Sequence, residues 1–227
     1  MQIIEIFKSL QGESSYAGWP CVFVRLAGCN LRCVWCDSEY TFRGGNRMTL
    51  DEVMQEVRHL SPAGGLVEIT GGEPLLQERE TIPLMQRLID SGYKVLLETS
   101  GERALDHVPQ QVVKIVDVKC PDSGEGDTFR MTNLQFLKPT DELKFVVASR
   151  RDYEFAREFM REHELSSRVS SVILSPAFRK DATGSRDVSH CLLDPQLLAE
   201  WMLADGLNAR LGLQIHKFIW DPALKGV

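Results

Sequence analysis

Several features are absent from this sequence of 227 residues, and each absence excludes a class of protein. No run of eighteen apolar residues occurs, so no membrane-spanning helix is predicted. Residues 1–8 lack a basic segment followed by a long apolar one, so we predict no signal peptide and expect a cytoplasmic protein. The 26 Lys and Arg residues are outnumbered by 32 Asp and Glu residues, and the formal charge of −6 disfavours a general electrostatic attraction to nucleic acid.

Paired cysteine motifs are also missing, which weakens one common explanation for cysteine-rich loops. A structural zinc site usually draws its ligands from two pairs, but Cys21, Cys120 and Cys191 are isolated. A protein that is not exported stays in a reducing compartment, where thiols remain free to bind a metal or cluster. The sequence does contain three cysteines within eight residues, in the spacing C-x3-C-x2-C: Cys29, Cys33 and Cys36.

These three cysteines follow an apolar segment, residues 21–28, that has the composition of a buried strand. A [4Fe–4S] cluster normally takes four Cys ligands, so three local thiolates would leave one iron open to a small molecule. Two alternatives remain open on spacing alone. One is a zinc site, because thiolates also bind zinc, and the other is a group of buried thiols without a metal.

The cysteine spacing resembles the signature of the radical S-adenosylmethionine (SAM) enzymes, and the aromatic Trp35 just before the last cysteine fits that pattern. The resemblance implies that Cys29, Cys33 and Cys36 hold a [4Fe–4S] cluster. It also implies that SAM binds the open iron through its amino and carboxylate groups, and that reduction of the cluster cleaves SAM to a 5′-deoxyadenosyl radical. An electron donor such as flavodoxin or ferredoxin would then be a partner.

Strand-like apolar runs alternate with helical patterns along the chain, which predicts parallel strands joined by right-handed crossovers. A complete eight-unit barrel usually needs about 250 residues, and several units here have short or missing helices. We therefore predict one α/β domain, residues 1–227, folded as an incomplete TIM-like barrel of about six parallel strands. Its predicted elements include a helix over residues 50–60 that starts with a capping box, a strand over residues 142–147, and a last strand over residues 212–215 and 217–220.

Polar or glycine-rich segments follow the predicted strands, where ligands gather in parallel α/β proteins. They are residues 70–74 (Thr-Gly-Gly-Glu-Pro), 98–101 (Glu-Thr-Ser-Gly), 117–119 (Asp-Val-Lys) and 175–176 (Ser-Pro). The glycine pair lets backbone approach a ligand closely, and Glu73 and nearby carbonyls offer acceptors to an ammonium group. The Gly-Gly-Glu-Pro segment resembles the radical SAM motif that holds the methionine amino group, and a simple turn is the alternative.

The resemblance implies a cofactor surface drawn from these segments and from the cysteine loop: Trp35, Cys36, Asp37, Gly72, Glu73, Glu98, Ser100, Asp117, Lys119 and Ser175. Glu98 and Ser100 suit hydrogen bonds to ribose hydroxyls, and a solvated strand end is the alternative for both. The alternative for Lys119 is an ion pair with a surface carboxylate.

Longer segments narrow the resemblance to the 7-carboxy-7-deazaguanine synthase family. They are residues 10–13, 23–29, 36–38, 97–101, 141–147 and 213–217, which span nearly the whole chain. Ser14 departs from the pattern, because the family usually has Gly after Gln-Gly-Glu. The resemblance implies a homodimeric carbon–nitrogen lyase that converts 6-carboxy-5,6,7,8-tetrahydropterin to 7-carboxy-7-deazaguanine with loss of ammonia, in the queuosine pathway of tRNA modification.

The family resemblance also assigns substrate-binding roles, to Leu10, Gln11, Gly12, Arg25 and Thr70. Arg25, taken as catalytic together with the three cysteines, would bind the substrate carboxylate through two charge-assisted hydrogen bonds, and a structural ion pair is its alternative. Ser38 occupies the family's Mg²⁺ position, with a helix cap as its alternative.

Two other functions remain as alternatives at this point. A glycyl-radical-enzyme activating enzyme shares the short length and the cysteine spacing, but it would act on a protein and consume SAM. A zinc-stabilised binding module would have no catalytic activity.

Overall fold

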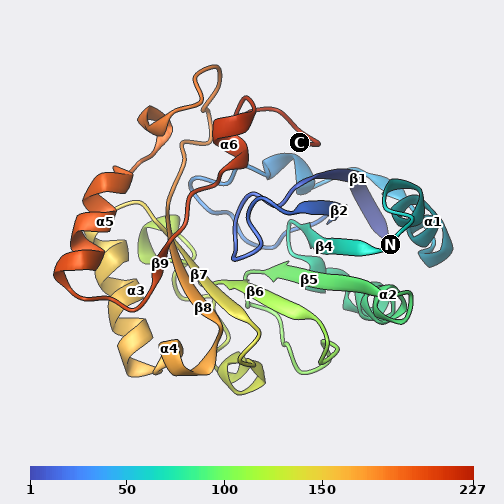
Figure 1. Ribbon diagram of the computed structural model, residues 1–227, viewed down its shortest axis with the longest axis horizontal. Coiled ribbons are helices and arrows are strands. Elements are labelled where there is room, and N and C mark those ends of the chain that lie inside the picture. Colours follow the sequence, from blue (N-terminus) through green and yellow to red (C-terminus); the bar gives the residue numbers. More distant parts are fainter.

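The computed structural model describes all 227 residues, and its centre is one nine-stranded sheet. The strands are β1 (Gln2–Leu10), β2 (Pro20–Leu26), β3 (Asn46–Arg47), β4 (Gly65–Gly71), β5 (Tyr93–Thr99), β6 (Val113–Asp117), β7 (Glu142–Val147), β8 (Ser171–Pro176) and β9 (Arg210–Leu211). They lie in the order β3-β1-β2-β4-β5-β6-β7-β8-β9, so the sheet is open (Figure 1). From β2 to β9 every neighbouring pair is parallel, whereas β1 and β3 add to one edge as antiparallel strands.

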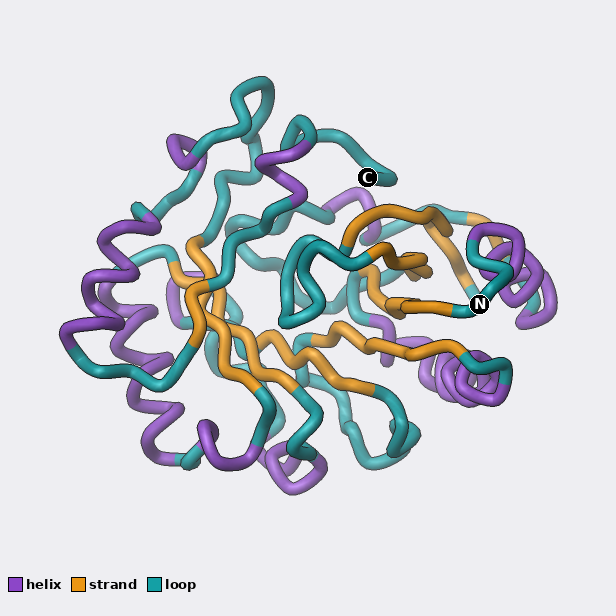
Figure 2. Tube along the Cα trace, in the orientation of Figure 1, coloured by secondary structure: helices purple, strands orange, loops and turns teal.

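The helices that precede β9 lie outside the strands (Figure 2). They are α1 (Leu50–Leu60), α2 (Glu78–Asp90), α3 (Arg150–Glu162), α4 (Leu165–Arg168), α5 (Pro195–Ala204) and α6 (His216–Ile219). No α-helix covers the connections from β5 to β6 or from β6 to β7. The prediction of an incomplete barrel with missing helices is therefore confirmed, and β2, β4, β5, β6, β7 and β8 are its six parallel strands of five or more residues. None of these helices is long and apolar enough to span a bilayer.

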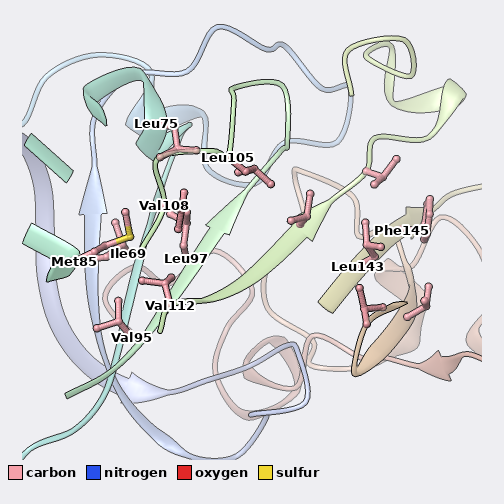
Figure 3. Packing of buried hydrophobic residues seen from close by; sticks show 14 of the residues in the cluster. Ile69, Leu75, Met85, Val95, Leu97, Leu105, Val108, Val112, Leu143 and Phe145 are labelled. Carbon is pink, nitrogen blue, oxygen red and sulfur yellow. The ribbon is translucent and has the colours of Figure 1, made fainter. Parts of the chain in front are cut away.

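Side chains of the parallel strands alternate between two faces of the sheet. The outward face is apolar: Ile69 of β4 and Val95 and Leu97 of β5 are essentially buried and pack with Met85 of α2 (Figure 3). Burial of each such side chain contributes about 1.5–3 kcal/mol to stability. This apolar layer therefore holds the helices against the sheet.

The inward face of the same strands is polar near their carboxyl ends. The inward residues there are Arg25 on β2, Thr70 on β4, Glu98 on β5, Asp117 on β6 and Lys144 on β7. Strand register pairs Arg25 with Thr70 and Asp117 with Lys144, so these groups share one layer. The sheet thus has an apolar outside and a charged inside at the end where ligands of parallel α/β proteins bind.

Two local predictions are confirmed, and a third is wrong. Helix α1 begins with the predicted capping box, in which Glu52 N donates to Thr49 Oγ1 and Thr49 N donates to Glu52 Oε2 at 2.7 Å. Strand β7 has the predicted bounds. The predicted last strand over residues 212–220 does not form, because the chain leaves the sheet after β9 and Ile215 N donates to the Gly12 carbonyl oxygen (2.8 Å) before α6 begins.

Candidate active site

A cavity of about 420 Å³ opens at the carboxyl ends of the parallel strands. Its wall combines the loop after β1, the cysteine loop after β2, the inward ends of the strands, α6 and the C-terminal residues 222–227. The predicted site residues that line it are Leu10, Gln11, Gly12, Arg25, Cys29, Cys33, Trp35, Cys36, Asp37, Ser38, Thr70, Gly72, Glu98, Ser100, Asp117 and Lys119. Two predicted residues, Glu73 and Ser175, do not line it.

The three predicted cluster ligands are free thiols on one partly exposed loop. Arg32 shapes this loop, because its Nη1 atom donates to the carbonyl oxygens of Cys29 (2.8 Å) and Leu31 (2.6 Å). Burial raises the pKa of all three thiols, and that of Cys36 to about 11, so each keeps its proton until a metal displaces it.

The donor set fits an iron–sulfur cluster better than a structural zinc ion. Three thiols from one loop, with no fourth cysteine or histidine beside them, match a cluster with an open iron and fall short of a closed four-ligand zinc site. No group of three His, Cys, Asp or Glu side chains in the chain is already arranged around a metal position.

The glycine pair after β4 brings that strand end against the cysteine loop. A Cβ atom on Gly72 would lie 2.2 Å from the Gly28 carbonyl oxygen and 2.7 Å from Cys29 Cβ. Gly71 has φ of +145°, and a Cβ atom there would lie 2.3 Å from the Leu26 carbonyl oxygen. Glycine is thus required here by close packing of two backbones as well as by any ligand.

Glu73, the next residue in this motif, is fully buried behind the cavity wall. Its carboxylate accepts hydrogen bonds from Leu75 N (3.0 Å), Thr99 Oγ1 (2.9 Å), Ser100 N (2.9 Å) and Ser100 Oγ (2.7 Å). The expectation that this carboxylate accepts from a ligand ammonium group is therefore corrected, because its oxygens are occupied by the end of β5.

Ser175 requires a similar correction. Its side chain is buried and packs against Gly212. A Cβ atom added to Gly212 would lie only 2.7 Å from Ser175 Oγ. Since Ser175 faces the crossing of β8 and the C-terminal segment, it does not reach the cavity.

Arg25 shows features of both alternatives considered for it. Its Nε atom donates to Glu5 Oε1 (2.9 Å), which also accepts from Tyr40 Oη (2.8 Å). Burial raises the pKa of Tyr40, so its hydroxyl keeps the proton that it donates. No group of the chain accepts from the two terminal nitrogens of Arg25, which lies in the cavity wall. The ion pair therefore orients the guanidinium and leaves its outer edge for a ligand.

Asp37 and Ser38 extend the cysteine loop into the cavity. Asp37 Oδ2 lies 2.5 Å from Lys217 Nζ, and although burial opposes its charge, Lys217 lowers the pKa of Asp37 well below its usual range. Ser38 Oγ donates to Asp37 Oδ1 (2.9 Å). Ser38 also holds the N-cap position of the short 3-10 helix Glu39–Thr41, so the helix-cap alternative is confirmed for its position, although its side chain makes no capping hydrogen bond.

A buried network of charges joins the loop after β1 to the strand ends. Lys144 Nζ lies 2.6 Å from both Glu13 Oε2 and Glu98 Oε1, and 3.6 Å from Asp117 Oδ2. Burial opposes the charge on Glu13, but Lys144 outweighs it and lowers the pKa of Glu13 to about 2. Glu98 also accepts from Thr70 Oγ1 (3.1 Å).

Lys119 belongs to the same wall and does not pair with an exposed surface carboxylate. Its Nζ atom donates to Asp117 Oδ2 (2.8 Å). Burial opposes its charge, whereas Asp117 raises its pKa above the ordinary value. A permanent cation therefore lies beside the cysteine loop, where it favours a negatively charged ligand or cluster.

Several cavity residues were missed by sequence reasoning: Glu13, Glu68, Lys144, Gln214, His216 and Lys217. His216 closes over the loop after β1 so tightly that a Cβ on Gly12 would lie 2.0 Å from its Nδ1 atom. Burial lowers the pKa of His216, which favours the neutral ring. For Glu68 and Lys144, the signal available in the sequence was a charged residue within an otherwise apolar strand.

The departure at Ser14 also has a structural explanation. Ser14 has φ of +46°, in the left-handed region that glycine adopts without penalty. Its Oγ atom accepts from Tyr16 N (3.1 Å), which helps to hold this turn. The loop therefore keeps the shape that a glycine would take.

Comparison with known proteins gives four matches. The Radical SAM superfamily model matches residues 24–118. A 7-carboxy-7-deazaguanine synthase of Koribacter versatilis (strain Ellin345) is 70% identical over 227 residues, which is the full length of both chains. The enzyme of that name from Chlorobaculum tepidum is 44% identical over 230 residues and covers all of this chain and 97% of its own. The crystal structure of QueE from Escherichia coli superposes with a TM-score of 0.72 over 93% of each chain at 24% identity, a likeness that concerns the fold.

Proposed function

The chain belongs to the 7-carboxy-7-deazaguanine synthase family of the radical SAM superfamily, and from this premise we propose how its cavity carries out the family's reaction. The enzyme is a lyase of queuosine biosynthesis that converts 6-carboxy-5,6,7,8-tetrahydropterin to 7-carboxy-7-deazaguanine with loss of ammonia. The family drawn from the sequence motifs is thus confirmed. One observation carries the residue-level proposal: three free thiols and the open edge of Arg25 line the same cavity.

On the cofactor side, Cys29, Cys33 and Cys36 hold the [4Fe–4S] cluster. Together with SAM, that cluster would supply the radical chemistry of the reaction, and these three thiols are the residues that would hold it. The ammonium group of Lys119 would stabilise negative charge on the cluster or on a ligand beside the cysteine loop. The remaining cofactor contacts that we propose are Trp35, Asp37, Gly72, Glu98, Ser100 and Asp117.

We propose that Glu73 and Ser175 do not contact the cofactor and instead position other parts of the site. Glu73 accepts from both the backbone and the hydroxyl of Ser100, so it fixes the orientation of the residue proposed to contact SAM. Ser175 supports the C-terminal segment where it crosses β8. Both are therefore proposed as positioning residues.

On the substrate side, the outer edge of Arg25 binds the pterin carboxylate. A planar fork suits a carboxylate because it donates two parallel charge-assisted hydrogen bonds. Leu10, Gly12 and Thr70 complete the wall around the pterin ring, and Gln11 lines the bottom of the cavity below that ring. Ser38 offers its hydroxyl to Mg²⁺, and substrate and water oxygens would complete the coordination shell.

The cover of the cavity supports radical chemistry by excluding water. Residues 222–227 and α6 line the cavity on the side away from the strands, and Lys225 Nζ lies 4.1 Å from the centroid of the Tyr40 ring. A partly covered site reduces solvent access and thereby limits side reactions of a reactive intermediate. A single domain over residues 1–227, a homodimer, a cytoplasmic location, and flavodoxin or ferredoxin as the electron donor remain predictions.

The test is turnover of the anaerobically reconstituted protein with SAM, a reductant and 6-carboxy-5,6,7,8-tetrahydropterin. We expect 7-carboxy-7-deazaguanine, detected by its ultraviolet spectrum and mass, with SAM recovered intact over many turnovers. A glycyl-radical-enzyme activating enzyme would instead consume SAM and make no deazapurine. Metal analysis addresses the non-catalytic alternative, since about four irons per chain are expected rather than one zinc.

A further inference from the structure

One buried carboxyl group in the cavity wall has no role in the assignments above. Glu68 lies on the inward face of β4, two residues before Thr70, and only 1% of its surface is exposed. Its Oε2 atom accepts from Gln11 Nε2 (2.8 Å), and no other donor in the chain reaches this carboxyl group. A carboxyl group at the bottom of a cavity with one donor is poorly satisfied, so it favours a ligand that brings donors.

Gln11 holds Glu68 in place and has little freedom of its own. It is 3% exposed, its Oε1 atom accepts from Glu13 N (2.6 Å), and its Nε2 atom donates to Glu68. Both ends of the amide are therefore committed, and the orientation of the Glu68 carboxyl group is set by the loop after β1.

Resting on the proposed function, we propose that Glu68, oriented by Gln11, accepts hydrogen bonds from the 2-amino group and N3–H of the pterin and thereby selects a 2-aminopyrimidine ring. These two substrate groups are adjacent, parallel donors. A carboxylate presents two adjacent acceptors, which is the complementary arrangement.

Strand register supports this placement. Arg25 pairs with Thr70, and Phe23 pairs with Glu68, so Glu68 lies two residues, or about 7 Å, deeper than the Arg25 layer. A fused bicycle with a carboxylate on one ring and an amino group on the other needs recognition groups at two such levels. At the level of Glu68, the rings of Phe7 and Phe23 stack with a 5.0 Å centroid separation and give the cavity an apolar wall.

The surroundings of Glu68 disfavour its ionised form in the absence of a ligand. Burial, followed by the charge of Glu98, raises the pKa of Glu68 to about 8. The other titratable groups facing it are Glu13 from the loop after β1, Cys21 from β2 and Lys144 from β7. Two donors from a ligand stabilise the carboxylate, so binding near neutral pH releases a proton from Glu68 to solvent.

The test is an equilibrium titration of the cluster-loaded, SAM-bound protein with two fluorescent ligands. Pterin-6-carboxylate carries the 2-amino group, and lumazine-6-carboxylate carries a 2-oxo group in its place. Glu68→Gln is compared with Glu142→Gln, because Glu142 is also a fully buried inward carboxylate, bonded to Ser15, but lies outside the cavity wall. Glu68→Asp keeps the charge and serves if the Gln variant folds poorly.

We expect the wild-type protein to prefer the pterin. Glu68→Gln should raise the Kd for the pterin roughly 10- to 100-fold and change that for the lumazine little, because a charged acceptor pair is lost only for the pterin. Glu142→Gln should keep the wild-type preference. Equal affinity of the wild type for both ligands, or an unchanged preference in the Glu68 variants, would overturn the inference. Turnover is measured separately: a wild-type protein that binds as expected but makes no deazapurine would reject the proposed function and leave the recognition by Glu68 intact.

Discussion

Glu13 and Lys144, 131 residues apart in the sequence, form an ion pair of 2.6 Å inside the cavity wall. Glu13 follows β1 in the loop that carries the proposed substrate contacts, whereas Lys144 reaches across to Glu98 on β5 at the same distance. One ammonium group thus ties the substrate loop to the strand proposed to hold SAM.

Replacing this lysine should damage both stability and catalysis. Lys144→Met removes a buried cation and leaves the partly buried carboxylates of Glu13 and Glu98 without their partner, so we expect a loss of about 3–5 kcal/mol in the free energy of unfolding. Lys114→Met is the matched control, because Lys114 is equally buried and pairs with Asp141 at 2.8 Å but lies outside the cavity. Urea unfolding should show comparable losses for both variants, and kcat/KM under native conditions should fall only for Lys144→Met. Equal kinetic effects would argue against a coupling role.

The glycine pair makes a separate prediction about cluster loading. Gly72→Ala should distort the cysteine loop, since the new Cβ overlaps the Gly28 carbonyl and Cys29. The measurement is iron content after reconstitution, and it should fall strongly. Gly92→Ala is the control, because φ there is +84° with no atom within 4 Å, so it carries only a backbone penalty of about 1 kcal/mol. Normal iron content in Gly72→Ala would show that the loop tolerates the added group.

Arg25 tests substrate binding. Arg25→Lys keeps a positive charge but loses the fork, so KM for the pterin should rise roughly 10- to 100-fold, in line with loss of a charge-assisted hydrogen bond. Glu5→Gln should have a smaller effect, because the amide oxygen still accepts from Arg25 Nε and Tyr40. Steady-state kinetics decide between the readings: a larger effect from Glu5→Gln would mean that the ion pair, rather than ligand binding, is the task of Arg25.

Glu68 also predicts how stability depends on pH. Its pKa is about 8 in the folded protein, above the ordinary value of 4.5, so between these values the folded state holds a proton that the unfolded state has lost. Its contribution to stability must therefore fall as pH rises from about 4.5 to 8. The opposite shift of Glu13, to about 2, acts below this window. Thermal unfolding of the ligand-free protein should show a shallower fall in Tm over this range for Glu68→Gln, and parallel curves would contradict the shift.

The fold was largely predictable because its signals are local. The capping box of α1 and the continuous apolar pattern of β7 each depend on neighbouring residues, and both predictions match the structure. Residues 212–220 mislead because their apolar spacing resembles a strand, whereas their conformation is decided by Gly12, some 200 residues away in the sequence.

The site was predictable where motifs are contiguous, as in the cysteine loop and the glycine pair. Glu68 and Lys144 escaped because only strand register shows that they face inward together. Glu73 was assigned to the ligand because of its motif, and only the structure shows that Thr99 and Ser100 occupy its carboxylate.

The most direct test of the function is low-temperature electron paramagnetic resonance of the reduced, cluster-loaded protein before and after addition of SAM. An open iron on a cluster held by Cys29, Cys33 and Cys36 predicts a reduced [4Fe–4S] signal whose g-values shift when SAM binds, and predicts loss of that signal in Cys33→Ser. A signal that is unchanged by SAM, or a protein that loads zinc instead of iron, would contradict the assignment of this cavity to radical chemistry.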